Sequence, residues 1–294
     1  MTPGSYVGRF APSPTGPLHF GSLLAACASY LEARKHAGQW VLRVEDIDPP
    51  REQAGASDLI LRVLDAYGFE WDGEALFQRH SIEQHLAAVA ALADRCFECD
   101  CSRRLLAAEP VGELGTIYPG TCRDLGKPRG DTATRVRVGN AVSQFHDGLQ
   151  GLQRMELAAG SGDFVIQRRD GLIAYHLAVV VDDYLSGVTH IVRGIDLMPS
   201  THRQVFLQDQ LAYPRPEYSH IPVAVHPDGD KLSKLTGAPP LEAPNAATEL
   251  VRALQVLRQQ PPDGLERATV DTIWGWAQEN WDISALEGLR DVPA

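Results

Sequence analysis

The spacing of apolar and polar residues predicts strands and helices that alternate over the first 95 residues. An apolar strand pattern opens the chain, and a helical Ala- and Leu-rich run follows the prolines at 12, 14 and 17. The predicted elements are strands at 5–10 and 39–44 and helices at 19–35, 52–67 and 81–95. This alternation indicates a parallel sheet with helical crossovers.

The pattern then breaks and returns, which predicts an insertion in an α/β domain. Gly, Pro and paired cysteines dominate from Cys96 to about residue 130, and 134–170 look like short strands with turns. Helices are predicted again at 175–184 and 200–212, strands at 189–193 and 221–225, and terminal helices at 245–258 and 269–280. We divide the chain into the first half of the α/β domain at 1–95, the insertion at 96–170, the second half at 171–240 and a short helical C-terminal region at 241–294.

Composition and charge narrow the class of protein. The 294 residues are 44% hydrophobic, which is enough for a sizeable core. The net charge of −11 argues against a protein that coats nucleic acid, so any such contact would be local. No apolar run of about 18 residues and no signal-peptide pattern is present, so we expect a cytoplasmic protein without membrane contact. Nothing in the sequence indicates an obligate protein partner.

The segment between the first strand and the first helix carries the most specific pattern for chemistry. It reads Arg9-Phe-Ala-Pro-Ser-Pro-Thr-Gly-Pro-Leu-His-Phe-Gly-Ser22. Ligands bind at the carboxyl ends of parallel strands, and a helix that starts there offers N–H groups to phosphate. His19 can donate to a phosphate, and Gly21 leaves space for a nucleotide. A lone His-x-Gly is more often a helix cap, but the whole string favours a nucleotide site.

This string resembles the first signature of the class I aminoacyl-tRNA synthetases, in the glutamyl and glutaminyl branch, although Ser22 stands where the motif usually ends in His. The second family signature, Lys-Met-Ser-Lys-Ser, is similar to Lys231-Leu-Ser-Lys-Leu235. The resemblance implies a doubly wound, Rossmann-type parallel α/β catalytic domain with a zinc-containing insertion and a short helical C-terminal region.

The two signatures together imply a site for ATP. Adenylate formation brings a carboxylate in line with the α-phosphorus, and negative charge accumulates on the phosphates as pyrophosphate leaves. By resemblance, Lys234 offsets this charge with help from His19. Gly21 and Lys231 contact ATP, and Mg²⁺ accompanies the phosphates. Without the first signature, Lys231 and Lys234 would be interpreted as exposed loop residues.

Charged residues at strand ends indicate which amino acid is bound. A glutamate pocket needs fixed cations for the side-chain carboxylate and a carboxylate for the α-ammonium group. Arg9 and Arg193 supply cations, Glu45 a carboxylate and Tyr175 a hydroxyl. By similarity to glutamyl-tRNA synthetases, the two arginines read the γ-carboxylate, and the rest of the substrate is surrounded by Ala11, Ser13, Glu45 and Tyr175. The alternative is a sheet-end ion pair between Glu45 and Arg193.

Four of the five cysteines fall within the predicted insertion. Cys99, Cys101 and Cys122, with the phenolic oxygen of Tyr118, can provide three sulfurs and one oxygen for tetrahedral zinc. Cys96 is an alternative fourth ligand. Because the segment has little apolar material to hold it together, we expect a structural zinc ion rather than a set of scattered buried thiols.

Nearly the whole chain is similar to the glutamyl-Q tRNA(Asp) synthetase family. The likeness rests on the cysteine segment, on Ala-Val-Val-Val-Asp-Asp183, on Arg193-Gly-Ile-Asp196 and on the short stretch of about sixty residues after Lys234. Full-length glutamyl-tRNA synthetases continue into a helical anticodon-binding domain. We therefore expect that this chain does not bind the acceptor end and the anticodon of a tRNA at the same time. Those enzymes usually have Asn where this chain has Val179, which predicts a lost polar contact and weaker glutamate binding unless water replaces it.

This similarity implies a tRNA-modifying ligase. Members of the family activate glutamate without tRNA and transfer it to the queuosine base in the anticodon of tRNA(Asp), so the implied partners are L-glutamate, ATP and tRNA(Asp) bearing queuosine. One alternative is a minimal glutamyl-tRNA synthetase that charges a tRNA 3′ end. Another is a non-catalytic nucleotide-binding paralogue, which the retention of Arg9, His19, Glu45, Arg193 and Lys234 argues against.

Overall fold

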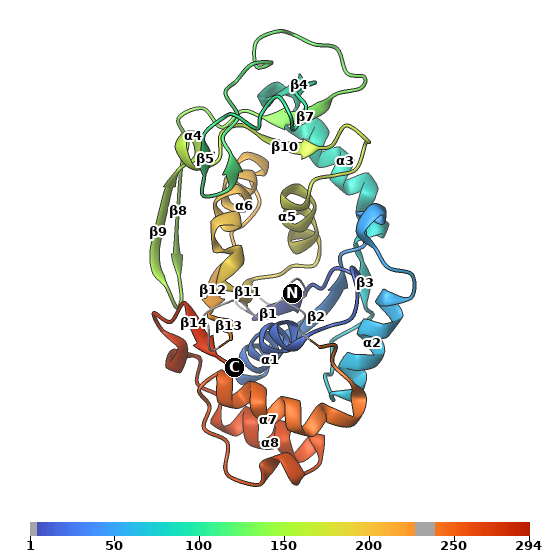
Figure 1. Ribbon diagram of the computed structural model, residues 1–294, viewed down its shortest axis with the longest axis vertical. Coiled ribbons are helices and arrows are strands. Elements are labelled where there is room, and N and C mark those ends of the chain that lie inside the picture. Colours follow the sequence, from blue (N-terminus) through green and yellow to red (C-terminus); the bar gives the residue numbers. More distant parts are fainter. Residues whose placement is uncertain (1–4, 227–238) are drawn as a thin grey trace.

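A parallel sheet assembled from two separate stretches of the chain lies in the middle of the molecule (Figure 1). The computed structural model describes residues 5–226 and 239–294. The strands from the first stretch are β1 (Val7–Phe10), β2 (Gln39–Val44) and β3 (Leu76–Phe77), and those from the second are β11 (His190–Gly194) and β12 (Glu217–Ile221). The two groups meet where the Thr189 N–H donates to the Val7 carbonyl at 2.9 Å, so β1 lies beside β11. The predicted parallel α/β fold is therefore confirmed.

Helices cover the sheet on opposite sides (Figure 1). One apolar core joins the sheet to α1 (Phe20–Lys35), α2 (Ala56–Ala66), α7 (Ala246–Val256) and α8 (Val270–Asn280). A second joins α3 (Ile82–Ala91), α5 (Tyr175–Leu185) and α6 (Met198–Leu211). Helix α2 begins four residues later than predicted, because Gly55 has a φ of 77°, which an α-helix cannot include.

The segment after α3 forms a separate layer at one end of the molecule (Figure 1). Its antiparallel strands are β4 (Cys96–Cys99), β7 (Ala133–Val136) and β10 (Phe164–Gln167), with a small hairpin of β5 (Val111–Gly112) and β6 (Gly115–Thr116). A second hairpin, β8 (Val142–Asp147) and β9 (Gly151–Glu156), precedes the short helix α4 (Leu157–Gly160). We expected this hairpin within the insertion, but β8 pairs with β12 at Asp147 and Tyr218 and so extends the central sheet.

The C-terminal residues return to the sheet. The strand predicted at 221–225 is split at Pro222 into β12 and β13 (Val223–Val225), because proline has no N–H with which to continue a ladder. Strand β14 (Asp291–Pro293), which the sequence pattern did not predict, pairs in parallel with β13. Among the described residues, no helix is both long and apolar enough to cross a membrane.

Candidate active site

A cavity of about 430 Å³ opens where β1, β2 and β11 end, at the start of α1. The proline-rich loop runs from the end of β1 at Phe10 to the start of α1 at Phe20, so its residues reach the cavity from one side. The lining residues that the sequence predicted for the substrate sites are Arg9, Ala11, Ser13, His19, Gly21, Glu45, Tyr175 and Arg193. Every predicted glutamate and ATP residue in the described part of the chain thus faces one cavity.

The described residues on either side of the second signature lie beside this cavity or the loop that lines it. Ala224, in β13, lines the cavity, and the described chain stops two residues later. After the chain resumes at residue 239, Pro240 forms an antiparallel bridge with His19, and the N–H of Leu241 donates to the carbonyl of Leu18 at 2.9 Å. Lys231 and Lys234 lie outside the described residues.

A buried ion network holds one wall of the cavity. Arg43 Nη2 donates to Asp183 Oδ1 at 2.7 Å and lies 3.4 Å from Glu45 Oε1. Arg9 Nε lies 3.7 Å from the same Asp183 oxygen. Burial raises the pKa of Glu45, while the charges of Arg43 and Arg9 oppose that rise. Since Glu45 pairs with Arg43, and Arg193 has other partners, the geometry does not support an ion pair between Glu45 and Arg193.

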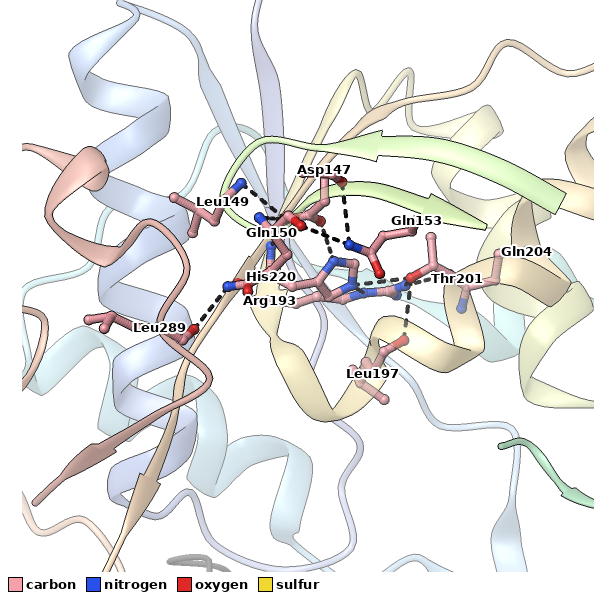
Figure 2. Close-up of polar contacts among 11 residues, drawn as sticks. Asp147, Leu149, Gln150, Gln153, Arg193, Leu197, Thr201, Gln204, His220 and Leu289 are labelled. Carbon is pink, nitrogen blue, oxygen red and sulfur yellow. Dashed lines mark hydrogen bonds and ion pairs between the residues drawn. The ribbon is translucent and has the colours of Figure 1, made fainter. Parts of the chain in front are cut away.

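Arg193 is held by neutral acceptors rather than by a carboxylate (Figure 2). Its Nε donates to His220 Nε2 at 3.1 Å, and its Nη2 donates to Thr201 Oγ1 and Gln204 Oε1, each at 2.7 Å. His220 Nδ1 in turn lies 2.5 Å from Asp147 Oδ2. All five side chains are buried. The network places a cationic group on the cavity wall with two of its three nitrogens already bonded.

Several of these supporting residues were not predicted from the sequence. The sequence around Asp183 does indicate a buried polar role, because two adjacent carboxylates, Asp182 and Asp183, interrupt an apolar helix. The carboxylate of Asp182 accepts a hydrogen bond from Gln78 Nε2 at 2.7 Å and lies 2.9 Å from His85 Nε2. Asp182 and Asp183 therefore belong to two different hydrogen-bond networks. Asp147 and His220 had no such signal.

Val179, at which we predicted a lost substrate contact, is packed in the helical core. It is 1% exposed and belongs to the cluster formed by α3, α5 and α6. It is not one of the cavity's lining residues, although Tyr175, one helical turn earlier, is. Ser22, the departure from the first signature, does line the cavity.

Three of the predicted metal ligands are drawn together in the separate layer. The sulfur atoms of Cys99, Cys101 and Cys122 lie within 4.8 Å of one another. The hydroxyl oxygen of Tyr118 is 3.5 Å from the Cys99 sulfur and accepts the N–H of Cys122 at 2.7 Å. Cys96 packs instead against the helical core. Three thiols and a phenol around one point are a donor set that suits zinc.

Comparison with known proteins assigns most of the chain to one family model. Residues 6–240 match the model described as tRNA synthetases class I (E and Q), catalytic domain. A protein of Ectopseudomonas mendocina (strain ymp) named glutamyl-Q tRNA(Asp) synthetase is 50% identical over 290 residues, which cover 98% of this chain and 97% of that protein. A protein of the same name from Dechloromonas aromatica (strain RCB) is 49% identical, with coverage of 98% and 99%.

Solved structures resemble the fold. A glutamate tRNA ligase from Elizabethkingia meningosepticum CCUG26117 superposes with a TM-score of 0.79 at 21% identity, covering 98% of this chain and 67% of that one. Glutamate-tRNA synthetase from Elizabethkingia anophelis gives the same TM-score and identity, with coverage of 99% and 68%. This likeness shows that the chain has the fold of these two solved structures.

Two buried histidines predict how stability depends on pH. Burial lowers the pKa of His202 and of His220 to about 4; Asp147 raises that of His220, and Arg193 lowers it. Unfolded histidine titrates near 6.5, so between pH 6.5 and 4 the unfolded chain binds more protons and stability falls as pH falls. We expect a loss of roughly 2 kcal/mol per histidine between pH 7 and 5.

Urea unfolding at the two pH values measures this loss. His202→Gln should reduce the measured loss by the share of that one histidine, roughly 2 kcal/mol; burial also lowers the pKa of His176, to about 3, so part of the pH dependence remains in this variant. His80→Gln, which replaces an exposed histidine, is the matched control. Equal unfolding free energies of the wild-type protein at pH 7 and 5 would contradict the prediction.

Proposed function

The chain belongs to the class I (E and Q) tRNA synthetase family, within the glutamyl-Q tRNA(Asp) synthetases, and from this membership we propose that it activates glutamate with ATP and transfers it to tRNA(Asp). The observation that carries the proposal is the cavity at the strand ends, because it gathers those predicted glutamate and ATP residues that the structure describes, from both halves of the sheet. It combines two cations, a carboxylate and a phenol within reach of a helix N-terminus.

The charges of the cavity suit glutamate. Arg9 and Arg193 are 5% and 4% exposed, so a carboxylate that reaches them is shielded from water and forms strong charge-assisted hydrogen bonds. Glu45 and the neutral Tyr175 hydroxyl, whose pKa is raised by burial, are acceptors for the α-ammonium group. Ala11 and Ser13 complete the wall beside them.

The start of α1 suits the phosphates of ATP. Helix N-termini attract anions through unpaired N–H groups, and α1 begins with His19 and Gly21 facing the cavity. The glutamate α-carboxylate oxygen attacks the α-phosphorus, and the bond to pyrophosphate breaks. We assign Lys234, with Lys231 and His19, to the charge that develops on the leaving phosphates. Mg²⁺, when bound beside the phosphates, neutralises the same charge.

Transfer to queuosine in tRNA(Asp) is the finer part of the proposal. Relatives about half identical over their whole length carry the name glutamyl-Q tRNA(Asp) synthetase. A family member that charges the 3′ end of tRNA(Glu) is the second candidate, since the solved neighbours are glutamate tRNA ligases.

Activation is tested by glutamate-dependent exchange of pyrophosphate into ATP. The wild-type protein should catalyse this exchange without tRNA, and Lys234→Ala should lower it at least about 100-fold, because the leaving phosphates lose a counter-charge. Lys35→Ala removes a lysine at the other end of α1 and is the control. Wild-type exchange in Lys234→Ala would refute the role of the lysine, and no exchange in the wild type would refute the activation step.

The acceptor is tested by transfer of labelled glutamate. We expect label on tRNA(Asp) that bears queuosine and none on tRNA(Asp) without it or on tRNA(Glu). Label on the terminal ribose of tRNA(Glu) would favour the second candidate and contradict the queuosine acceptor.

Zinc at Cys99, Cys101, Tyr118 and Cys122 is tested by elemental analysis of purified protein. We expect one zinc per chain, loss of the metal in Cys122→Ser because one of the clustered thiolates is removed, and full retention in Cys96→Ser. Tyr118→Phe should bind the metal more weakly. A folded wild-type protein without metal, or zinc loss in Cys96→Ser, would contradict this ligand set.

A further inference from the structure

Three neighbouring strands carry a line of polar side chains that ends at Arg193 (Figure 2). The parallel register of β11 and β12 sets Arg193 opposite His220. On the other side, β12 meets β8 at Asp147, the last residue of β8. Asp147 and His220 are both 0% exposed, and Arg193 is 4% exposed. The sheet thus connects a buried carboxylate to a cavity-lining cation through one imidazole.

The hydrogen bonds specify one form of His220. Its Nε2 receives the Nε–H of Arg193, so Nε2 carries no proton. Its Nδ1 faces Asp147 Oδ2 at 2.5 Å and therefore donates. The other Asp147 oxygen accepts the backbone N–H groups of Leu149, Gln150 and His220 at 3.0–3.1 Å, which fixes the carboxylate. The imidazole is thereby held neutral, with its proton on Nδ1.

The same contacts determine which part of the guanidinium is available. Nε and Nη2 are bonded to His220, Thr201 and Gln204. Nη1 is buried and has no hydrogen-bond partner among the residues that the structure describes. An unsatisfied buried donor is costly, so this nitrogen is left for a further acceptor, which a ligand in the cavity that Arg193 lines can supply.

We propose that His220, held in its neutral form by Asp147, is a positioning residue that aims Arg193 at the substrate carboxylate and so selects glutamate over glutamine. The inference rests on the proposed function. A guanidinium carries only donors, and a carboxylate carries only acceptors, whereas the amide of glutamine also presents N–H groups. With its other nitrogens fixed, Arg193 cannot turn to accommodate an amide, and the mismatch leaves buried groups unpaired.

A nucleophilic triad is the competing interpretation, because Thr201 Oγ1 lies 3.1 Å from His220 Nε2, which continues to Asp147. The lone pair on Nε2 is already used by Arg193, and Thr201 donates to the carbonyl of Leu197 at 3.3 Å. None of Thr201, His220 and Asp147 lines the cavity. The geometry therefore favours support of Arg193 over attack on a substrate.

Two replacements of His220 in the full chain test the inference. His220→Gln retains an acceptor near the position of Nε2, whereas His220→Leu removes it. Glutamate-dependent pyrophosphate exchange gives kcat, KM for glutamate and KM for ATP, and the same assay with glutamine gives the discrimination ratio. His202→Leu removes a buried histidine that bonds Ser143 rather than Arg193, and is the matched control.

We expect His220→Leu to raise KM for glutamate about 10- to 100-fold, with kcat and KM for ATP changed less than about threefold, because Arg193 acts on binding rather than on the reacting atoms. The preference for glutamate over glutamine should fall in parallel. His220→Gln should restore KM to within about fivefold of the wild-type value, and His202→Leu should leave it unchanged.

The possible results distinguish failure of the proposed function from failure of this inference. A wild-type protein without exchange refutes the proposed function. An active His220→Leu variant with unchanged KM and unchanged discrimination overturns only this inference, as do equal KM losses in His220→Leu, His220→Gln and His202→Leu. Imidazole ¹⁵N spectra of the wild type, assigned with His220→Gln, add a test that needs no leucine variant. Protonated Nδ1 and bare Nε2 at pH 7 are expected, and an imidazolium or the Nε2–H form overturns the inference.

Discussion

Three buried arginines lie at the carboxyl end of the sheet, and the site depends on the hydrogen-bond acceptors that fix their guanidinium groups. Arg9, Arg43 and Arg193 are all buried. Burial lowers the pKa of Arg9, Asp183 opposes this effect, and the charges of Arg193 and Arg43 lower the pKa further. Buried guanidinium groups are tolerated only with fixed partners. The elements that supply those partners, α5 and α6 together with β8 and β12, are therefore as necessary to the cavity as the strands whose ends form it.

The residues that line the cavity could be singled out from the sequence. Arg9, His19 and Glu45 stand in short strings that directly follow a strand or start a helix, and such local patterns set their own backbone geometry. β1, α1 and β2 lie within two residues of their predicted positions. The gathering of Cys99, Cys101 and Cys122 was predictable from their spacing, whereas the separation of Cys96 from them is visible only in the structure, because β4 directs Cys96 and Cys99 into different clusters.

The residues that support Arg193 from behind the cavity could not be predicted from the sequence. Asp147 and His220 are 73 residues apart, and only the pairing of β8 with β12 joins them. No local pattern encodes that register, and the short strands around Asp147 were assigned to the insertion. Position 179 shows the converse case. The Asn that is usual there in glutamyl-tRNA synthetases suggested a substrate contact that Val179 loses, whereas the rotation of α5 directs Val179 into the core while Tyr175 faces the cavity.

The two cavity arginines are anchored in different ways, and the difference bears on selectivity. Arg9 lies beside the carboxylate of Asp183, which offsets part of its charge. Arg193 is oriented by an imidazole, a hydroxyl and an amide, and its nearest carboxylate in that network, Asp147, acts only through His220. A carboxylate in direct contact with Arg193 would compete with the substrate for the same charge. With the imidazole between Asp147 and Arg193, three neutral acceptors orient the guanidinium, and none of its printed hydrogen bonds among the described residues goes to a carboxylate.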